Sequence, residues 1–200
     1  MKVKVDKLGK RYGFQFVVRN INLDIYCGSM LGLSGRNGAG KSTMMQMIAG
    51  FLSPSEGTIA YTIDTEEILR ESVYKYISYT APYIELPQRV TIEELLNHYK
   101  IFKNVSIEKY EDFLQFCEIE DQNEKFIENF SSGMKQKIAL GINLITDAHL
   151  SLFDEPTSYL DSHAKDWFYT KLKQIKGQKT IVIASNDQDD FKICDSIYEI

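Results

Sequence analysis

One short segment of this 200-residue chain combines glycines, a lysine and two hydroxyl side chains in a spacing that suits polyphosphate. The segment fits the phosphate-loop pattern G-x-x-x-x-G-K-[ST]. Its residues are Gly35, Arg36, Asn37, Gly38, Ala39, Gly40, Lys41, Ser42 and Thr43. We expect these residues to bind the phosphates of a nucleotide.

Each residue type in this loop has a physical role. Gly38 and Gly40 let the backbone approach phosphate oxygens and adopt positive φ. The amide N–H groups then point into one concave anion site. Lys41 adds a positive charge for the β- and γ-phosphates, and the Ser42 hydroxyl can bind Mg²⁺.

The flanking residues decide between this role and a glycine-rich turn with a chance lysine. Residues 30–34 are short and mostly apolar, as in a buried parallel strand. Residues 43–50 form a helix-like apolar run that ends in glycine. A strand before the loop and a helix after it are the context that the phosphate-loop function requires.

A second cluster follows an apolar strand, where residues 149–153 lead into Asp154 and Glu155. Asp154 is expected to hold Mg²⁺ through its oxygens, and Glu155 to lie near the γ-phosphate and polarise a water molecule. The alternative is an ordinary acidic turn after a strand. The phosphate loop upstream favours the metal and water roles.

A third candidate is the start of a helix near residue 131. Small polar residues open an amphipathic run, so the free N–H groups of the first turn make an anion site. The residues are Ser131, Ser132, Gly133 and Met134. A plain N-capped helix explains the same pattern, and on physical grounds alone it is the simpler interpretation.

Composition indicates an ordinary globular chain that can bury a core as one domain. The formal net charge is −5, so we expect no nucleic-acid partner. The first residues lack the apolar run of a secretory signal, and no uncharged apolar stretch is long enough for a membrane span. Cys27, Cys117 and Cys194 show no metal-ligand spacing and are expected to be reduced and mostly buried.

Hydrophobic patterning supplies the elements that must position these residues. Short alternating runs over residues 1–34 predict β-strands, as do residues 58–61, 76–79, 150–153 and 180–184. From Thr91 the period becomes helical, with Glu94 completing a capping box. Strand–helix–strand alternation implies parallel strands with right-handed crossovers.

The chain resembles the ATP-binding-cassette (ABC) family along essentially its whole length. Phe130 to Met134 stand where the family has its signature, and Asp154 to Asp161 are similar to the Walker B strand end and the D-loop. Lys10 to Gly13 resemble the A-loop, in which Tyr12 would stack on adenine. The order and spacing of these motifs are highly specific.

The resemblance implies an α/β fold: a P-loop NTPase core of ABC type with an N-terminal antiparallel β subdomain and an inserted helical subdomain. The whole chain, 1–200, would be one ABC ATPase domain. Residues 1–89 and 147–200 would form the core with the β subdomain, and residues from about 90 to 146 the helical subdomain including the signature helix. A terminal strand is expected near residues 195–200, with no regulatory domain after it.

The resemblance also implies the activity, cofactors and partners. The chain would bind ATP and Mg²⁺ and hydrolyse ATP, with Ser42 and Asp154 on the metal and Glu155 and Asn186 as catalytic residues. A second ABC ATPase subunit, identical or not, would pair head to tail, so that Ser131 to Met134 and the D-loop residue Asp161 meet the partner's ATP. An integral membrane permease subunit would hold the pair at the cytoplasmic, inner face of the cell membrane.

Two positions depart from the family pattern. Alignment on residues 77–81 places Pro82 where a glutamine is expected, and Glu85 or Gln88 are candidate substitutes. Asn186 stands where a switch histidine is expected, and it can donate only a neutral hydrogen bond. These departures predict slow hydrolysis. The three histidines, His98, His149 and His163, are expected to be ordinary surface or helix residues.

Three functions are compatible with the sequence. The first is the nucleotide-binding subunit of a transporter, and the resemblance implies a groove there for a permease helix. Tyr83, Ile84, Leu86 and Pro87 are apolar enough to line it, although internal packing of that loop explains them equally well. The second is a soluble cassette ATPase without a transport role, although such proteins carry tandem cassettes or long insertions. The third is a weakly hydrolysing, ATP-gated dimerisation module, which Pro82 and Asn186 favour and Glu155 opposes.

Overall fold

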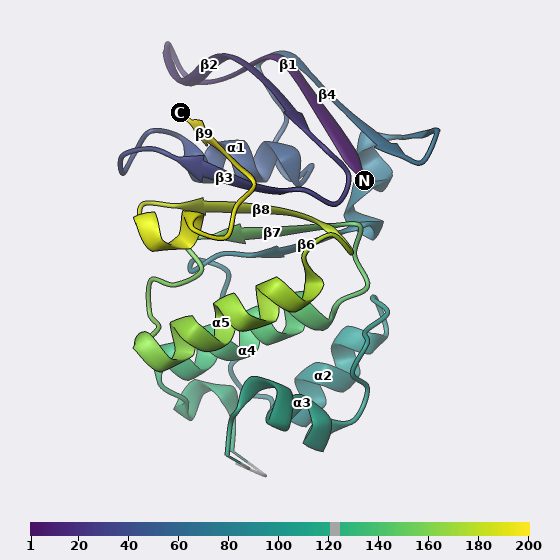
Figure 1. Cartoon of the computed structure of the whole chain (residues 1–200), viewed down its shortest axis with the longest axis vertical. Coiled ribbons are helices and arrows are strands. Elements are labelled where there is room, and N and C mark those ends of the chain that lie inside the picture. The colour runs from purple at the N-terminus through teal and green to yellow at the C-terminus, as the bar shows by residue number, and fades with distance from the viewer. Residues whose placement is uncertain (121–124) are drawn as a thin grey trace.

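The computed structural model describes residues 1–120 and 125–200, arranged as two sheets with helices between and below them (Figure 1). The strands are β1 (Lys2–Tyr12), β2 (Gln15–Ile25), β3 (Met30–Ser34), β4 (Glu56–Ile63), β5 (Glu66–Ile68), β6 (Ile77–Thr80), β7 (Leu150–Asp154), β8 (Thr180–Ser185) and β9 (Ser196–Glu199). The α-helices are α1 (Lys41–Ile48), α2 (Ile92–Lys100), α3 (Tyr110–Cys117), α4 (Ser132–Ile145) and α5 (Ser162–Ile175). Short 3₁₀ helices are η1 (Arg70–Lys75), η2 (Ile127–Asn129) and η3 (Gln188–Phe191).

The two sheets differ in strand direction. The first has the order β2-β1-β4-β5 and is antiparallel, and the second has the order β6-β7-β8-β3-β9 and is parallel. This arrangement confirms the predicted fold class. The predicted strands and the capping box at Thr91 are confirmed as well. The subdomain boundaries stay a prediction, although α2, α3 and α4 all fall within residues 90–146.

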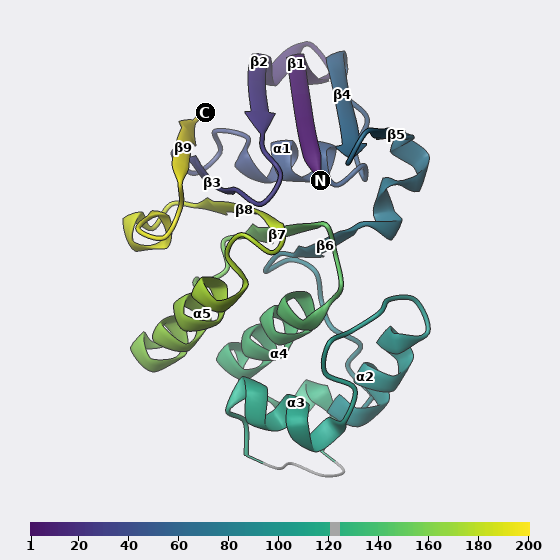
Figure 2. The same cartoon turned by 45° about the vertical axis from the view of Figure 1, so that its right-hand side comes forward.

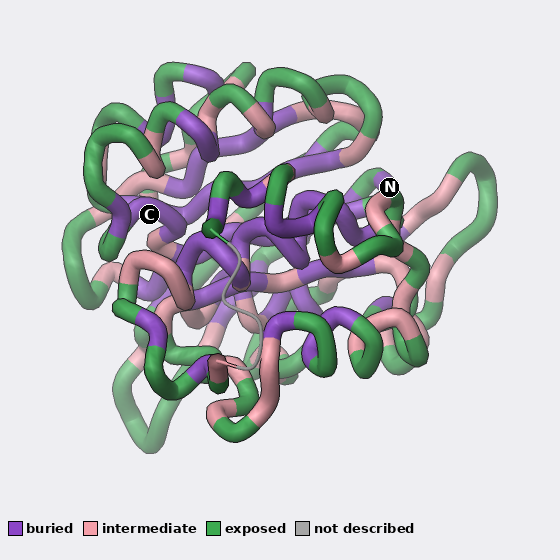
Figure 3. Tube along the Cα trace, turned by 90° about the horizontal axis from the view of Figure 1, so that it is seen from below, coloured by how far each residue is buried: buried purple, intermediate pink, exposed green. Residues whose placement is uncertain are grey.

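Successive side chains of the parallel strands point to opposite faces of the second sheet, so a hydrophobic core lies on each face. In β8, Ile181 and Ile183 pack towards α4 and α5, whereas Val182 and Ala184 pack towards α1. Helix α1 lies between the two sheets, and α4 and α5 cover the opposite face (Figures 1 and 2). Buried chain accordingly runs through the middle of the molecule (Figure 3). Because helices cover both faces of the central strands of the second sheet, the ends of these strands are where side chains can reach a ligand.

Two smaller points concern single residues and membrane contact. All three histidines are exposed, as expected, but Cys27 is exposed as well, so the prediction of mostly buried thiols is wrong for that residue. Cys27 lies in the turn between β2 and β3, outside the apolar pattern of either strand. Within the described part of the chain, every helix is too short or too polar to span a bilayer.

The capping box that starts α2 provides a test of the fold. The Thr91 side chain accepts from the Glu94 amide at 3.1 Å, and Glu94 accepts from the Thr91 amide at 2.8 Å. Thr91→Ala should lower the free energy of unfolding by about 1 kcal/mol, because one amide of the first turn loses its partner. Thr91→Ser keeps the hydroxyl and serves as the control. Equal urea midpoints for the alanine and serine variants would contradict the cap.

Candidate functional site

The phosphate loop joins the end of β3 to the start of α1, as its sequence context predicted. Gly38 and Gly40 have φ of 82° and 102°, in the region that side chains disfavour. A Cβ on Gly40 would lie 2.4 Å from a methyl carbon of Val18, so the β2 strand also requires glycine there. A Cβ on Gly38 would meet no atom within 4 Å, so that backbone faces open space.

Lys41 begins α1 and is only 6% exposed. Its Nζ lies 3.3 Å from Oε1 of Glu155 and donates to the Gly35 carbonyl at 2.9 Å. A buried ammonium must be paired or hydrogen-bonded, because water no longer solvates it. Glu155 is therefore the counterion of Lys41 in this structure.

A hollow of about 410 Å³ opens beside this ion pair. Its lining combines phosphate-loop residues with Glu155 and one residue of β2. The lining residues are Val17, Asn37, Gly38, Gly40, Lys41, Ser42, Thr43 and Glu155. Gly35, Arg36 and Ala39 belong to the loop but not to this lining, so the structure brings together most of the predicted phosphate-binding residues.

Asp154 ends β7 and is fully buried. Its Oδ2 accepts hydrogen bonds from the hydroxyls of Tyr79 and Tyr83, both at 3.2 Å. Burial raises the pKa of Asp154, and hydrogen bonds that include the Ser42 hydroxyl oppose that rise. Among the described residues, Oδ1 has no hydrogen-bond partner.

The donor set around Asp154 fits a divalent cation with oxygen ligands. The orphaned Oδ1 and the Ser42 hydroxyl are hard oxygen donors, which Mg²⁺ prefers. Across residues 1–120 and 125–200, no group of three or more His, Cys, Asp or Glu forms a metal cage. A cation here would therefore take its other ligands from phosphate and water.

Asn186 follows β8 and lies at the same end of the sheet. Its backbone amide donates to Oε2 of Glu155 at 3.3 Å, and its side-chain amide donates to Oδ1 of Asn37 at 3.1 Å. Glu155 itself has φ of 46°, a conformation that costs a non-glycine residue on the order of 1–2 kcal/mol. The Asn186 backbone amide and the Lys41 ammonium hold the Glu155 carboxylate beside the phosphate loop.

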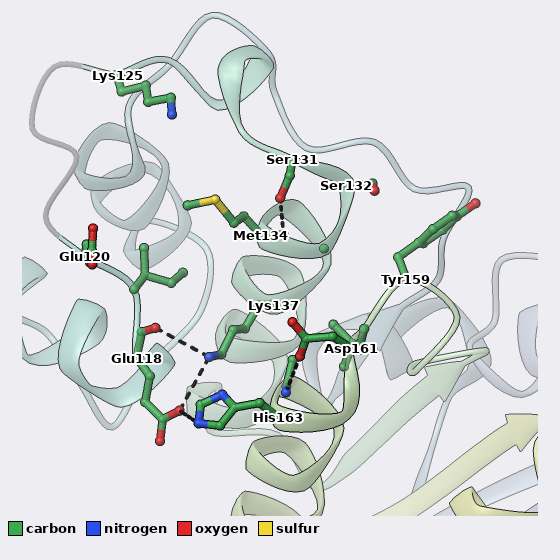
Figure 4. Close-up of a pocket in the computed structure, with 14 residues that line it drawn as sticks. Glu118, Glu120, Lys125, Ser131, Ser132, Met134, Lys137, Tyr159, Asp161 and His163 are labelled. Atoms are coloured by element: carbon green, nitrogen blue, oxygen red, sulfur yellow. Dashed lines mark hydrogen bonds and ion pairs between the residues drawn. The ribbon is translucent and has the colours of Figure 1, made fainter.

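The signature-like residues lie elsewhere, at a second hollow of about 620 Å³ (Figure 4). Ser131, Ser132, Gly133 and Met134 line it together with Asp161. Ser131 caps α4 by accepting from the Met134 amide at 3.2 Å. Asp161 caps α5 by accepting from the Ala164 amide at 2.8 Å. Of the described residues, none lines both this hollow and the phosphate-loop hollow.

Three further expectations have mixed outcomes. Tyr12 ends β1, is 53% exposed and does not line the phosphate hollow, so its stacking on adenine stays a prediction. Gln88 donates to the Leu86 carbonyl and accepts from Lys135, so its side chain is engaged away from Asp154. Besides Ser42, the side chains of Tyr79 and Tyr83 reach Asp154. These two contacts were not predicted, since nothing in the spacing of the tyrosines marks them.

The comparisons with known proteins agree with one another. The family model described as "ABC transporter" matches residues 18–158. The ABC transporter ATP-binding protein NatA of Bacillus subtilis is 34% identical over 190 residues, covering 92% of this chain and 77% of the relative. The Nod factor export ATP-binding protein I of Rhizobium johnstonii is 31% identical over 203 residues, covering 98% of this chain. The chain spans 65% of the length of that Rhizobium relative.

Solved structures give the same fold. An ATP-binding subunit of an ABC transporter superposes with a TM-score of 0.87 at 26% identity, covering 100% of this chain and 86% of the other. The dimeric cassette MJ0796 bound to ADP and Pi superposes with a TM-score of 0.85 at 24% identity, covering 99% of this chain and 94% of the other.

The Lys41–Glu155 pair generates two predictions for phosphate binding. Lys41→Ala should weaken binding of tripolyphosphate and of ATP by about 10- to 100-fold, because a charged hydrogen-bond donor is lost. Lys173→Ala removes an exposed lysine of α5 and is the matched control. Calorimetric titration of both variants with tripolyphosphate and with ATP measures these affinities. Equal affinities in the two variants would contradict the role of Lys41.

Glu155→Gln should have the opposite effect on binding. The substitution removes the anion that competes with phosphate for Lys41, so affinity for ATP should rise by a few-fold, about 1 kcal/mol or less for one partly exposed pair. Turnover should fall by about 100-fold or more, because the carboxylate that orients water is lost. Weaker ATP binding together with unchanged turnover would reject both roles of Glu155.

Proposed function

The chain belongs to the ABC transporter family, and from that membership we propose that it is a nucleotide-binding subunit that hydrolyses Mg²⁺-ATP to drive transport through separate membrane subunits. The observation that carries the proposal is the convergence of Lys41, Asp154, Glu155 and Asn186 at one end of the parallel sheet. These residues come from α1, β7 and the segment after β8. Lys41 and Glu155 pair at one hollow, Asp154 directly precedes Glu155, and the Asn186 amide donates to Glu155. These groups would supply a cation, a carboxylate for Mg²⁺ and a carboxylate that orients water.

ATP would bind by replacing Glu155 as the anion that contacts Lys41. The β- and γ-phosphates would occupy the hollow, accept from the amides of the phosphate loop and displace Glu155 from Nζ. Asp154 and Ser42 would hold Mg²⁺, whose charge neutralises the phosphate oxygens. Glu155, freed from Lys41, would accept a hydrogen bond from the attacking water and orient it.

Asn186 would act on the γ-phosphate side of this hollow. Its contacts with Asn37 and Glu155 support that position. An amide donates a hydrogen bond but carries no charge, so it stabilises the transition state less than a protonated histidine would. Slow hydrolysis by the isolated subunit is therefore part of the proposal.

The separation of the two hollows supports pairing with a second cassette. In one chain, the signature-like residues share no lining residue with the phosphate loop within the described ranges. A head-to-tail partner would bring its Ser131 to Met134 onto this subunit's ATP, and Asp161 would lie at the same interface. The buried Gln136 side chain donates to the Pro156 carbonyl at 2.8 Å, so the signature helix and the D-loop segment are held together.

An apolar groove supports a membrane-protein partner. Ile84, Leu86 and Pro87 line a hollow of about 380 Å³ beside α2, whereas Tyr83 turns towards Asp154 instead. Ile101 and Phe102 at the end of α2 are largely exposed. Exposed apolar surface of this kind suits a helix of a permease, which would place the chain at the inner face of the membrane. A soluble cassette ATPase would not need this groove.

Asn186 provides the test that separates a slow ATPase from a binding module without turnover. Asn186→Ala should lower kcat by about 10-fold, less than the ~100-fold typical of a lost transition-state donor, because the contact is neutral. Asn186→His should raise kcat. Asn97→Ala, on the exposed face of α2, is the matched control. If Asn186→Ala hydrolyses saturating Mg²⁺-ATP as fast as the parent, Asn186 is not the γ-phosphate contact.

ATP-dependent pairing tests the interface. With turnover blocked by Glu155→Gln, sedimentation should show a dimer with ATP and a monomer without it, provided that the chain pairs with itself. Adding Gly133→Trp should abolish the dimer, because a Cβ at Gly133 already lies 3.0 Å from the Tyr159 carbonyl and the indole would fill the signature hollow. A dimer that persists in this variant would place the interface elsewhere.

A further inference from the structure

Two tyrosines occupy the region where Pro82 leaves no polar side chain. Tyr79 lies on β6, whose neighbour β7 carries Asp154 at its end. Tyr83 lies in the turn that the Ile84 amide closes on the Ala81 carbonyl at 3.0 Å. Both hydroxyls lie within hydrogen-bond distance of the same carboxylate oxygen, Oδ2 of Asp154.

The two hydroxyls also contact each other. Because each hydroxyl has a single proton, the three contacts cannot all be hydrogen bonds at the same time. Tyr79 and Tyr83 make a very short oxygen–oxygen contact, in which either can donate. Each phenol has one proton, so only two of the three contacts can be hydrogen bonds at one time. Every arrangement that uses both protons within this group leaves at least one hydroxyl donating to Asp154.

Both phenols can act as donors, because a phenol keeps its proton at neutral pH. The Gln46 side chain of α1 donates to the Tyr83 oxygen at 3.1 Å, which leaves the Tyr83 proton for Tyr79 or Asp154.

We propose that Tyr79 and Tyr83 are positioning residues for the metal site, which hold Oδ2 of Asp154 so that Oδ1 is presented to Mg²⁺. The two hydroxyls take the place of the polar side chain that Pro82 lacks. This inference rests on the proposed function, since it assigns a role in binding Mg²⁺-ATP. Groups that hydrogen-bond a metal ligand orient it and raise its affinity for the metal.

Tyr79 and Tyr83 are held by different neighbours. Each hydroxyl can therefore still donate to Asp154 when the other hydroxyl is removed. The Tyr79 ring packs edge-on against Phe51, with ring centroids 5.5 Å apart. Tyr83 is half-exposed and is fixed by Gln46. Removal of one hydroxyl leaves the other to donate to Oδ2, and only the double substitution removes both donors.

The experiment compares nucleotide affinity with and without metal in the full chain. A fluorescent N-methylanthraniloyl ATP is titrated in excess Mg²⁺ and again in excess EDTA, and the ratio of the two affinities measures the contribution of the metal. The variants are Tyr79→Phe, Tyr83→Phe and the double substitution. Tyr74→Phe, which removes the hydroxyl of an exposed tyrosine in η1, is the matched control.

The double variant should lose about 10-fold in the affinity ratio, the low end of what such outer contacts contribute to metal binding. Each single variant should lose less, and the control nothing. Affinity in EDTA should stay at the parent's value in every variant. The Mn²⁺ affinity of the ATP-loaded protein, followed by electron paramagnetic resonance, should fall in the same order.

Two results would overturn the inference while leaving the proposed function intact. One is an unchanged affinity ratio in the double variant. The other is an equal loss with and without metal, which would make the pair a structural contact only. A parent chain that binds no ATP under either condition would instead reject the proposed function, and the inference with it.

Discussion

The buried charge of Lys41 is the constraint on which the rest of the site depends. An ammonium that is 6% exposed needs an anion, and in the structure Glu155 and the Gly35 carbonyl satisfy it. Glu155 itself has φ of 46° and also accepts from the Asn186 amide. The contacts of Lys41 and Glu155 therefore link the phosphate loop, the end of β7 and the segment after β8.

The layered architecture explains why these groups meet. Side chains of β7 and β8 alternate between two hydrophobic cores. One core packs around α1 and the other packs against α4 and α5. With both faces of the central strands covered, a ligand meets the second sheet at the carboxyl ends of its parallel strands, as in other open α/β sheets. Asp154, Glu155, the phosphate loop and Asn186 all follow such ends. The same edge carries Tyr79 and Tyr83, which connect the Asp154 carboxylate to the loop that also lines the apolar groove.

Local features of this structure could be predicted from the sequence, because they depend on neighbouring residues. The phosphate loop, the capping box of Thr91 and the N-cap at Ser131 each satisfy backbone groups within a few positions. The resemblance to the ABC family then supplied the pairing of distant motifs. The contact of Asn186 with Asn37 and the meeting of two tyrosines on Asp154 could not be predicted, since they depend on strand order and side-chain direction. The exposed Cys27 shows the same limit: composition predicts burial, but a turn between strands overrides it.

The most direct test of this account is a crystal structure of the chain with Mg²⁺ and a non-hydrolysable ATP analogue. The account predicts phosphate oxygens on Nζ of Lys41, Glu155 withdrawn from Lys41, and the metal beside Oδ1 of Asp154 and the Ser42 hydroxyl. A nucleotide bound elsewhere, with the Lys41–Glu155 contact still intact, would contradict it.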